Sequence, residues 1–85
     1  MPFYFYLARC SDDSLYSGSC KDIQEREDMH NSGKGAKYTR AHRPVKIIYS
    51  ETFKTLSEAM KREAQVKTWS KINKEKLVHA QRVCS

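Results

Sequence analysis

The residues best suited to chemistry in this sequence are Arg26, His30 and Glu63. Arg26 and His30 fall in a predicted helix, where side chains four residues apart share a face. A guanidinium is planar, always charged and able to grip a phosphate through two parallel hydrogen bonds. An imidazole can exchange a proton near neutral pH. Two solvent-facing cations on an amphipathic helix would give the same pattern, so both interpretations stay open at this point.

Glu63 falls on the apolar face of a second predicted helix. Leu56, Ala59 and Met60 define that face at i, i+3 and i+4, and Glu63 follows at i+7. Glutamate is rarely buried without a partner. Its carboxylate is therefore expected to serve a shared site, as a metal ligand or an acid–base group. The alternative is a position at the helix edge or in a structural ion pair.

Two predicted strands near the N-terminus carry tyrosines. Tyr6 lies in the first strand, and the second contains Tyr16-Ser17-Gly18. The two rings would share one face of a sheet if the turn contains an odd number of residues. A two-residue turn at Asp12-Asp13 would put them on opposite faces. The sequence leaves this parity open, and packing within the sheet is the alternative role for both rings.

The elements that must position these side chains follow from hydrophobic periodicity and turn residues. Strands are predicted over residues 3–9, 15–18 and 45–53, and helices from 23 to about 31, from 56 to about 68 and from 71 to about 79. One more turn of helix is expected around residues 36–40. Asp22 with Glu25, and Thr55 with Glu58, form capping-box patterns. The order predicts a small α/β domain with a three-stranded sheet, mixed or antiparallel.

Length, charge and cysteine content limit the class of protein. The 85 residues fit one domain, expected over residues 1–80, with a frayed tail at 81–85. Lys and Arg outnumber Asp and Glu by 16 to 10, and residues 34–46 carry five of these cations with no acid. This favours nucleic acid, an anionic membrane or an acidic protein as partner, unless the charge only solvates the surface. Three cysteines without metal-type spacing, and no signal peptide or membrane span, favour a cytoplasmic setting.

Taken together and in order, these residues resemble the GIY-YIG nuclease superfamily. Tyr4-Phe5-Tyr6 stands at the first motif and Tyr16-Ser17-Gly18 at the second, and Arg26, His30 and Glu63 follow. The resemblance runs from residue 3 to about residue 78. It is closest to the small stand-alone bacterial members of the superfamily, through the stretches HNSGKGAKYTR and REAQVKTWSK. Some catalytic members use an asparagine after the glutamate, and the corresponding position here is Glu75.

The resemblance implies a three-stranded antiparallel sheet flanked by helices in the order β-β-α-β-α-α. It also implies hydrolysis of phosphodiester bonds in DNA or RNA with one divalent ion, Mg²⁺ or Mn²⁺. The implied catalytic residues are Tyr6, Tyr16, Arg26, His30 and Glu63, with Glu63 as the metal ligand. Arg26 would stabilise charge on the phosphate. Tyr6 or Tyr16 would orient or deprotonate the attacking water, and His30 would position a tyrosine or assist proton transfer.

Nucleic acid is the expected partner, with DNA favoured over RNA and no membrane involved. Backbone contacts are expected from a set of mostly basic residues, namely Lys21, Lys34, Lys37, Tyr38 and Arg40. Gly18 is expected to let the substrate approach the backbone closely. Two alternatives stay open: a non-catalytic nucleic-acid-binding module of the same fold, and a module that binds acidic proteins. A protein partner that supplies specificity is compatible with either a nuclease or a binding module.

Overall fold

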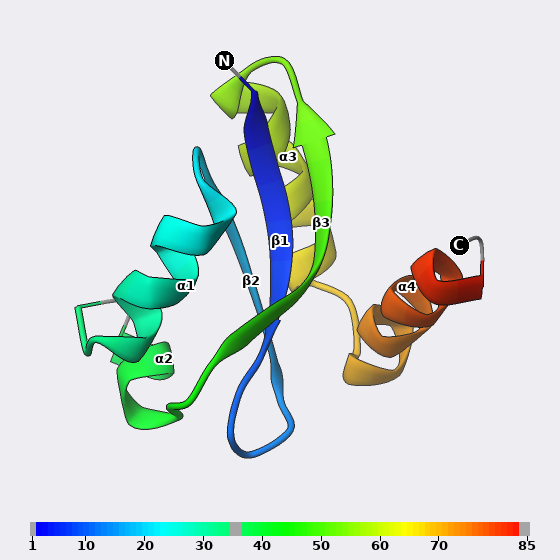
Figure 1. Cartoon of the computed structure of the whole chain (residues 1–85). Helices are drawn as coiled ribbons and strands as arrows, with labels where there is room; N and C mark the ends of the chain where they lie inside the picture. Colours follow the sequence, from blue (N-terminus) through cyan, green and yellow to red (C-terminus); the bar gives the residue numbers. More distant parts are fainter. Residues whose placement is uncertain (1, 35–36, 84–85) are drawn as a thin grey trace.

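The computed structural model describes residues 2–34 and 37–83, with side chains up to residue 80. The elements are β1 (Phe3–Arg9), β2 (Leu15–Cys20), α1 (Ile23–Asn31), α2 (Lys37–Ala41), β3 (Lys46–Phe53), α3 (Leu56–Lys67) and α4 (Lys71–Val83) (Figure 1). The predicted order and the three strands are confirmed. Strand β2 is longer than predicted, and α4 continues to Val83, past its predicted end near His79. The last two residues of the predicted tail, 84–85, lie outside the described residues.

The three strands form one antiparallel sheet in the order β2-β1-β3. In the register of β1 and β2, Arg9 pairs with Leu15 and Tyr6 pairs with Gly18. The connection between the strands, residues 10–14, therefore contains an odd number of residues. Since side chains alternate along a strand, Tyr6 and Tyr16 lie on the same face of the sheet. The register thus answers the question of parity that the sequence left open.

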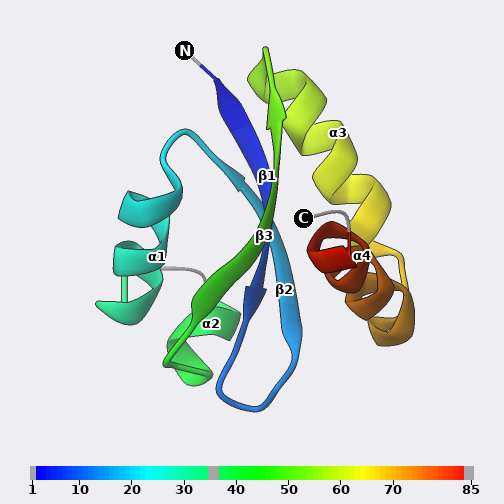
Figure 2. The ribbon, with the colours of Figure 1, turned by 45° about the vertical axis from the view of Figure 1, so that its right-hand side comes forward.

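Helices cover both faces of the sheet. Figure 2 shows α1 and α2 on one side and α3 and α4 on the other. The α3 side has a buried core of Phe5, Leu7, Leu15, Val66 and Val78. The α1 side has a second core of Tyr6, Ala8, Cys10, Cys20 and Val45. The two faces of β1 thus serve different cores, and the tyrosine face belongs to the α1 side.

The predicted N-caps Asp22 and Thr55 are confirmed, and they fix where α1 and α3 begin. The Asp22 carboxylate accepts a hydrogen bond from the backbone N–H of Glu25 at 3.0 Å. The Thr55 hydroxyl accepts one from the N–H of Glu58 at 3.2 Å. Each cap satisfies a backbone donor that has no partner within the helix. The helix that carries Arg26 and His30 and the helix that carries Glu63 are therefore defined locally by sequence.

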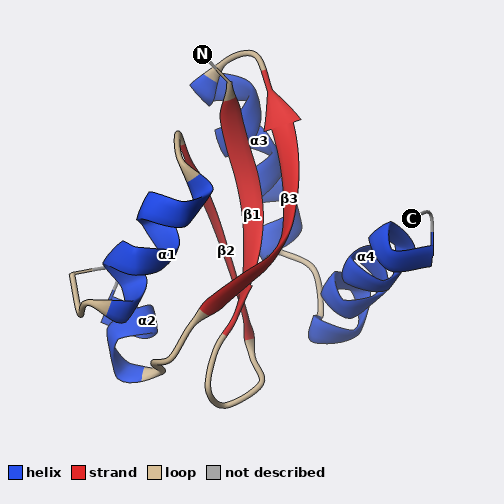
Figure 3. Cartoon of the chain, viewed as in Figure 1, coloured by secondary structure: helices blue, strands red, loops and turns tan. Residues whose placement is uncertain are grey.

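Two side chains tie α1 to the beginning of β3, one of the two edge strands of the sheet (Figure 3). The Asn31 amide accepts from the N–H of Val45 at 2.7 Å and donates to its carbonyl at 2.8 Å. Two residues after Val45, the backbone N–H of Ile47 donates to a Glu27 carboxylate oxygen at 2.7 Å. These bonds hold α1 at a fixed distance from the sheet.

The predicted apolar face of α3 is wrong for two of its three members. Ala59 is buried, but Leu56 is 40 % exposed and Met60 is 53 % exposed. The helix turns the face with Ala59 and Val66 toward the sheet, so Leu56 and Met60 fall beside it. Arg62 reinforces this orientation, because its guanidinium donates to Glu51 on β3 at 2.9 Å. A pattern of apolar residues over only seven positions at the start of a helix cannot distinguish the predicted orientation of the helix from the observed one.

Cys10 and Cys20 are buried free thiols, and Cys84 lies outside the described residues. Within residues 2–34 and 37–83, no helix has the length and apolar content needed to cross a bilayer.

Candidate functional site

A chain of buried hydrogen bonds joins β1, α1 and α2. The Tyr6 hydroxyl lies 2.8 Å from Nε2 of His30, and Nδ1 of His30 lies 2.9 Å from the Thr39 hydroxyl. All three side chains are almost fully buried. A buried polar side chain needs such partners, since an unmade hydrogen bond in the interior is costly. His30 is thus not one of two solvent-facing cations on α1.

Burial sets the protonation states of His30 and Tyr6. It lowers the pKa of His30, and the nearby charge of Arg26 lowers it further. The imidazole is therefore neutral at pH 7, with one nitrogen donating and the other accepting. Burial also raises the pKa of Tyr6, with Tyr16 adding to the effect and Arg26 opposing it. A phenol with a raised pKa stays protonated at neutral pH, so Tyr6 is suited to hold a hydrogen bond and not to remove a proton.

Gly18 faces the Tyr6 ring across the two strands. A Cβ atom at position 18 would lie 2.5 Å from Cζ of Tyr6. The phenol thus occupies the space that a side chain at position 18 would need. The close approach expected at Gly18 is made by the Tyr6 ring.

Tyr16 lies beside His30 and differs from Tyr6 in its exposure. Its ring meets the His30 ring edge-on, with centroids 5.7 Å apart. It is half-buried, and in the part of the chain that the structure describes its hydroxyl makes no hydrogen bond. Tyr38 stacks on Tyr16 at 6.1 Å and on His42 at 4.2 Å, and its hydroxyl donates to Ser14 at 2.6 Å. The Tyr38 ring therefore has a packing role, although its side chain is partly exposed.

Arg26 brings a positive charge to this cluster without a neutralising carboxylate. Its charge affects the pKa values of Tyr6, Cys20 and His30, which places it beside all three. The residue is half-buried, and no acidic side chain among the described residues lies within ion-pair distance of it. A guanidinium held in this state is available to bind an anion.

Glu63 approaches the same cluster from the α3 side of the sheet. Its side chain is 19 % exposed, and its negative charge adds to the rise in the Tyr6 pKa. One turn later, the Lys67 ammonium lies 2.9 Å from its carboxylate. The bond to Glu63 raises the pKa of Lys67, and Tyr16 adds to the rise. Lys67 thus bonds to the Glu63 carboxylate and interacts electrostatically with Tyr16.

The five candidate catalytic residues are therefore gathered around the β1–β2 pair. Tyr6 and Tyr16 come from the sheet, Arg26 and His30 from α1, and Glu63 from α3. The candidate nucleic-acid contacts are more spread out. Lys21 lines a pocket with Arg26, whereas Arg40 lines another with Arg43 near the end of α2. Lys34 and Lys37 are exposed, and residues 35–36 of the loop between them lie outside the described residues.

Sequence reasoning missed two residues of the cluster, Thr39 and Lys67. A threonine in a basic loop carries no signal of its own, and only the fold places it against His30. Lys67 did carry a signal, because it follows Glu63 at the spacing at which helical side chains form ion pairs.

Glu75, at the position where some catalytic members of the resembled superfamily carry asparagine, points elsewhere. Both of its carboxylate oxygens accept from the guanidinium of Arg9 on β1, one of them at 2.8 Å. This pair holds α4 against the end of the β1–β2 hairpin, and it lowers the pKa of Glu75. Lys71 strengthens the attachment through Asp13, at 3.3 Å.

Comparison with known proteins identifies the family of the chain. The model of the GIY-YIG catalytic domain matches residues 2–76. The chain belongs to the GIY-YIG family. It is 52 % identical over 75 residues to a UPF0213 protein of Staphylococcus saprophyticus, covering 88 % of this chain and 92 % of that protein. It is 50 % identical over 80 residues to a UPF0213 protein of Bacillus pumilus, covering 94 % of this chain and 82 % of the relative.

Two solved structures share the fold with this GIY-YIG chain. The solution structure of a UPF0213 protein from Bacillus halodurans has a TM-score of 0.59 at 41 % identity, covering 94 % of this chain and 85 % of that one. A solution structure from E. faecalis has a TM-score of 0.64 at 40 % identity, covering 98 % and 88 %. The predicted resemblance and the three-stranded antiparallel fold are confirmed.

Proposed function

We propose that this protein is a divalent-metal-dependent endonuclease that hydrolyses phosphodiester bonds of nucleic acid, DNA in preference to RNA. The observation that carries the proposal is the convergence of an unpaired guanidinium, Arg26, with the Tyr6–His30 pair, Tyr16 and Glu63. Family membership supports a nuclease, and the net charge of +6 supports a polyanionic substrate.

Arg26 would bind the scissile phosphate and stabilise the charge that develops on its oxygens. Two features support this role. The guanidinium has no carboxylate to release before it binds, and its half-buried position strengthens electrostatic attraction relative to bulk water. His30, neutral and fixed between two hydroxyls, would hold Tyr6 in place beneath the phosphate.

The two tyrosines have separate roles in this proposal. Tyr6 is buried, bonded to His30 and raised in pKa, so it would serve as a positioning residue. The Tyr16 hydroxyl makes no hydrogen bond to the described residues and lies at the more exposed end of the cluster. It would accept a hydrogen bond from the attacking water and orient it toward phosphorus.

Glu63 would hold the divalent ion. The site around Glu63 suits a hydrated cation that has a single protein ligand. The described residues contain no group of three or more His, Cys, Asp or Glu placed to share a metal. Mg²⁺ and Mn²⁺ sites of this kind keep several waters and take further oxygens from the substrate. When bound, such an ion supplies Lewis-acid stabilisation of the phosphate and of the leaving oxygen.

The test is a cleavage assay with labelled single-stranded, duplex, flap and branched DNA, and RNA, in Mg²⁺, Mn²⁺ and EDTA. Glu63→Gln and Arg26→Met are each expected to lower the rate by at least about 100-fold. Glu58→Gln on the same helix, and Lys76→Met on α4, are the matched controls, and both should cleave like the wild type. Activity that survives both site variants, or survives EDTA, would overturn the proposal.

A non-catalytic nucleic-acid-binding module is the second candidate. One observation favours it: Glu75 is committed to Arg9 and is not turned toward the Tyr6 cluster. This candidate predicts salt-sensitive binding without cleavage in either metal ion, with an affinity that falls in Arg26→Met and is unchanged in Glu63→Gln.

A further inference from the structure

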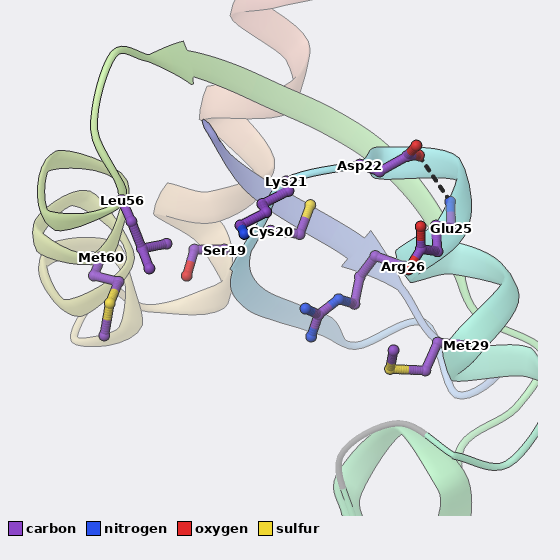
Figure 4. Close-up of a pocket in the computed structure, with 9 residues that line it drawn as sticks. All are labelled: Ser19, Cys20, Lys21, Asp22, Glu25, Arg26, Met29, Leu56 and Met60. Carbon is purple, nitrogen blue, oxygen red and sulfur yellow. Dashed lines mark hydrogen bonds between the residues drawn. The ribbon is translucent and has the colours of Figure 1, made fainter. Parts of the chain in front are cut away.

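A pocket of about 420 Å³ opens between α1 and α3, beside the edge of β2. Figure 4 shows Leu56 and Met60 of α3 on one side and Arg26 and Met29 of α1 on the other. Lys21, in the turn after β2, lies between the two helices in this view. The pocket therefore adjoins the proposed phosphate site through Arg26.

The α3 wall of the pocket is made by apolar side chains that the fold leaves uncovered. Leu56 is 40 % exposed and Met60 is 53 % exposed, although their spacing predicted a buried face. Met29 on α1 is half-buried and completes an apolar lining opposite them. Methionine sulfur contacts aromatic rings favourably and adapts to their shape.

The rim of the pocket combines opposite charges. Arg26 and Lys21 supply cations, whereas Glu25 supplies a carboxylate with no ion-pair partner in the described part of the chain. Asp22 is engaged in capping α1. A ligand that suits all of these groups carries a phosphate for Arg26, an apolar ring for the methionines and an amino donor for Glu25.

We propose that this pocket binds one unpaired nucleotide next to the scissile phosphate, with its base against Met29, Leu56 and Met60. This inference rests on the proposed function, and it names the substrate class as nucleic acid with a single-stranded segment at the cut. The volume of the pocket lies in the range of small-ligand sites. A base inside a duplex is stacked on its neighbours and cannot turn its face to such a wall, whereas an unpaired base can.

The test is an NMR titration of protein labelled with ¹⁵N and with ¹³C at the methionine methyl groups, in EDTA so that no cleavage occurs. The ligands are a short oligothymidylate, a short oligocytidylate, the matching duplex and inorganic phosphate. Both single strands are expected to shift the Met29 and Met60 methyl signals, the oligocytidylate more tightly because cytosine offers an amino group to Glu25. The duplex and phosphate should shift neither signal at the same concentration.

Variants sharpen the experiment. Met60→Gln is expected to weaken single-strand binding about five-fold. Ile72→Gln, at a 69 % exposed apolar side chain on α4, should leave the affinity unchanged. Methyl signals that stay unmoved while Arg26 amide signals respond would overturn this pocket and leave the nuclease proposal standing. No binding of any nucleic acid would overturn both. Methyl shifts that depend on protein concentration alone would instead identify an interface between two copies of the chain.

Discussion

The ring of Tyr6 lies against Gly18 on the neighbouring strand, in the space that any larger residue there would occupy. The second motif, Tyr16-Ser17-Gly18, thus ends in glycine because the Tyr6 ring of the first motif fills the adjacent space. The same contact aims the Tyr6 hydroxyl toward His30, 2.8 Å away. A residue identified from its place in a motif has, in the structure, a steric reason to be there.

Replacing Gly18 with alanine should therefore displace the Tyr6 ring. The new methyl group would overlap the phenol, and such overpacking costs roughly 1–3 kcal/mol of unfolding free energy. Denaturant unfolding measures the loss. Ser19→Ala, next along the strand with its side chain on the other face, is the control and should change stability by less than about 0.5 kcal/mol. Equal effects of the two substitutions would contradict the contact.

Stability should decrease as the pH falls below about 6.5, because His30 is buried in its neutral form. The pKa of His30 is lower in the folded state than in the unfolded state. The unfolded chain therefore binds more protons in this pH range, and acidification stabilises it relative to the folded state. This contribution is complete above the unfolded pKa and is lost as the pH falls toward the folded one. Urea unfolding at intervals from pH 7.5 to pH 5 measures the slope.

The matched variant for that series is His30→Gln, which should be less stable at pH 7.5 but flatter between pH 7 and pH 5. Glu75 does not titrate in the pH range of this series, because Arg9 keeps the pKa of Glu75 below its ordinary value of 4.5. The contribution of Glu75 to stability is therefore lost only in more acid solution. A wild-type slope that persists in His30→Gln would assign the effect to another group.

Ser17 is buried, and its hydroxyl has no hydrogen-bond partner among the described residues. An unsatisfied buried hydroxyl carries a desolvation cost of roughly 1–3 kcal/mol. Ser17→Ala removes that cost and leaves the packed volume of the side chain almost unchanged. The variant should therefore be more stable by about 1 kcal/mol. Thermal and urea unfolding check the gain, with Ser50→Ala on β3 as the comparison. A loss of stability at position 17 would show that the hydroxyl has a partner after all.

Lys67 should compete with a cation for the Glu63 carboxylate, because the two side chains form an ion pair at 2.9 Å. If Glu63 holds the metal ion, Lys67→Met should tighten Mn²⁺ binding by about three- to ten-fold. Calorimetry measures the affinity without any cleavage. Lys61→Met removes a lysine from the same helix that has no ion pair with the described residues, and it should change nothing. Weaker binding in Lys67→Met would mean that the lysine orients Glu63 for the ion.

The Arg9–Glu75 pair should contribute to stability by fixing α4. Its two charges are partly shielded from water and its geometry is bidentate, which makes it stronger than an ordinary surface ion pair. A double-mutant cycle of Arg9→Met and Glu75→Gln is expected to give a coupling energy of about 1–2 kcal/mol. Coupling near zero would show that α4 is held by its apolar contacts alone.

Most of the fold could be predicted from local signals. Turn residues after Arg9 and the caps at Asp22 and Thr55 each act within a few residues, so their sequence patterns are reliable. The rotation of α3 was not predictable in this way. It depends on which face meets β1 and β2, and Leu56 and Met60 are as apolar as residues that do pack there.

The sequence suggested which residues to consider as a candidate site, but it did not show their chemical environment. Motif order identified Tyr6, Tyr16, Arg26, His30 and Glu63. The burial of Tyr6 and His30 came only from the structure, and burial is what keeps His30 neutral and Tyr6 protonated. The hydrogen bond between His30 and Thr39 joins α1 to α2 across the connection between the two helices. Such a contact depends on tertiary packing, which the sequence pattern does not encode.

The bonds from Asn31 and Glu27 to the backbone of Val45 and Ile47 have a consequence for association between molecules. The outer side of β3 is a free sheet edge, the kind of surface on which another chain can add a strand. At the start of β3, helical side chains already occupy the backbone groups that an added strand would need. This end of the edge is therefore closed to strand addition, and the helix that carries Arg26 and His30 also protects the sheet from aggregation.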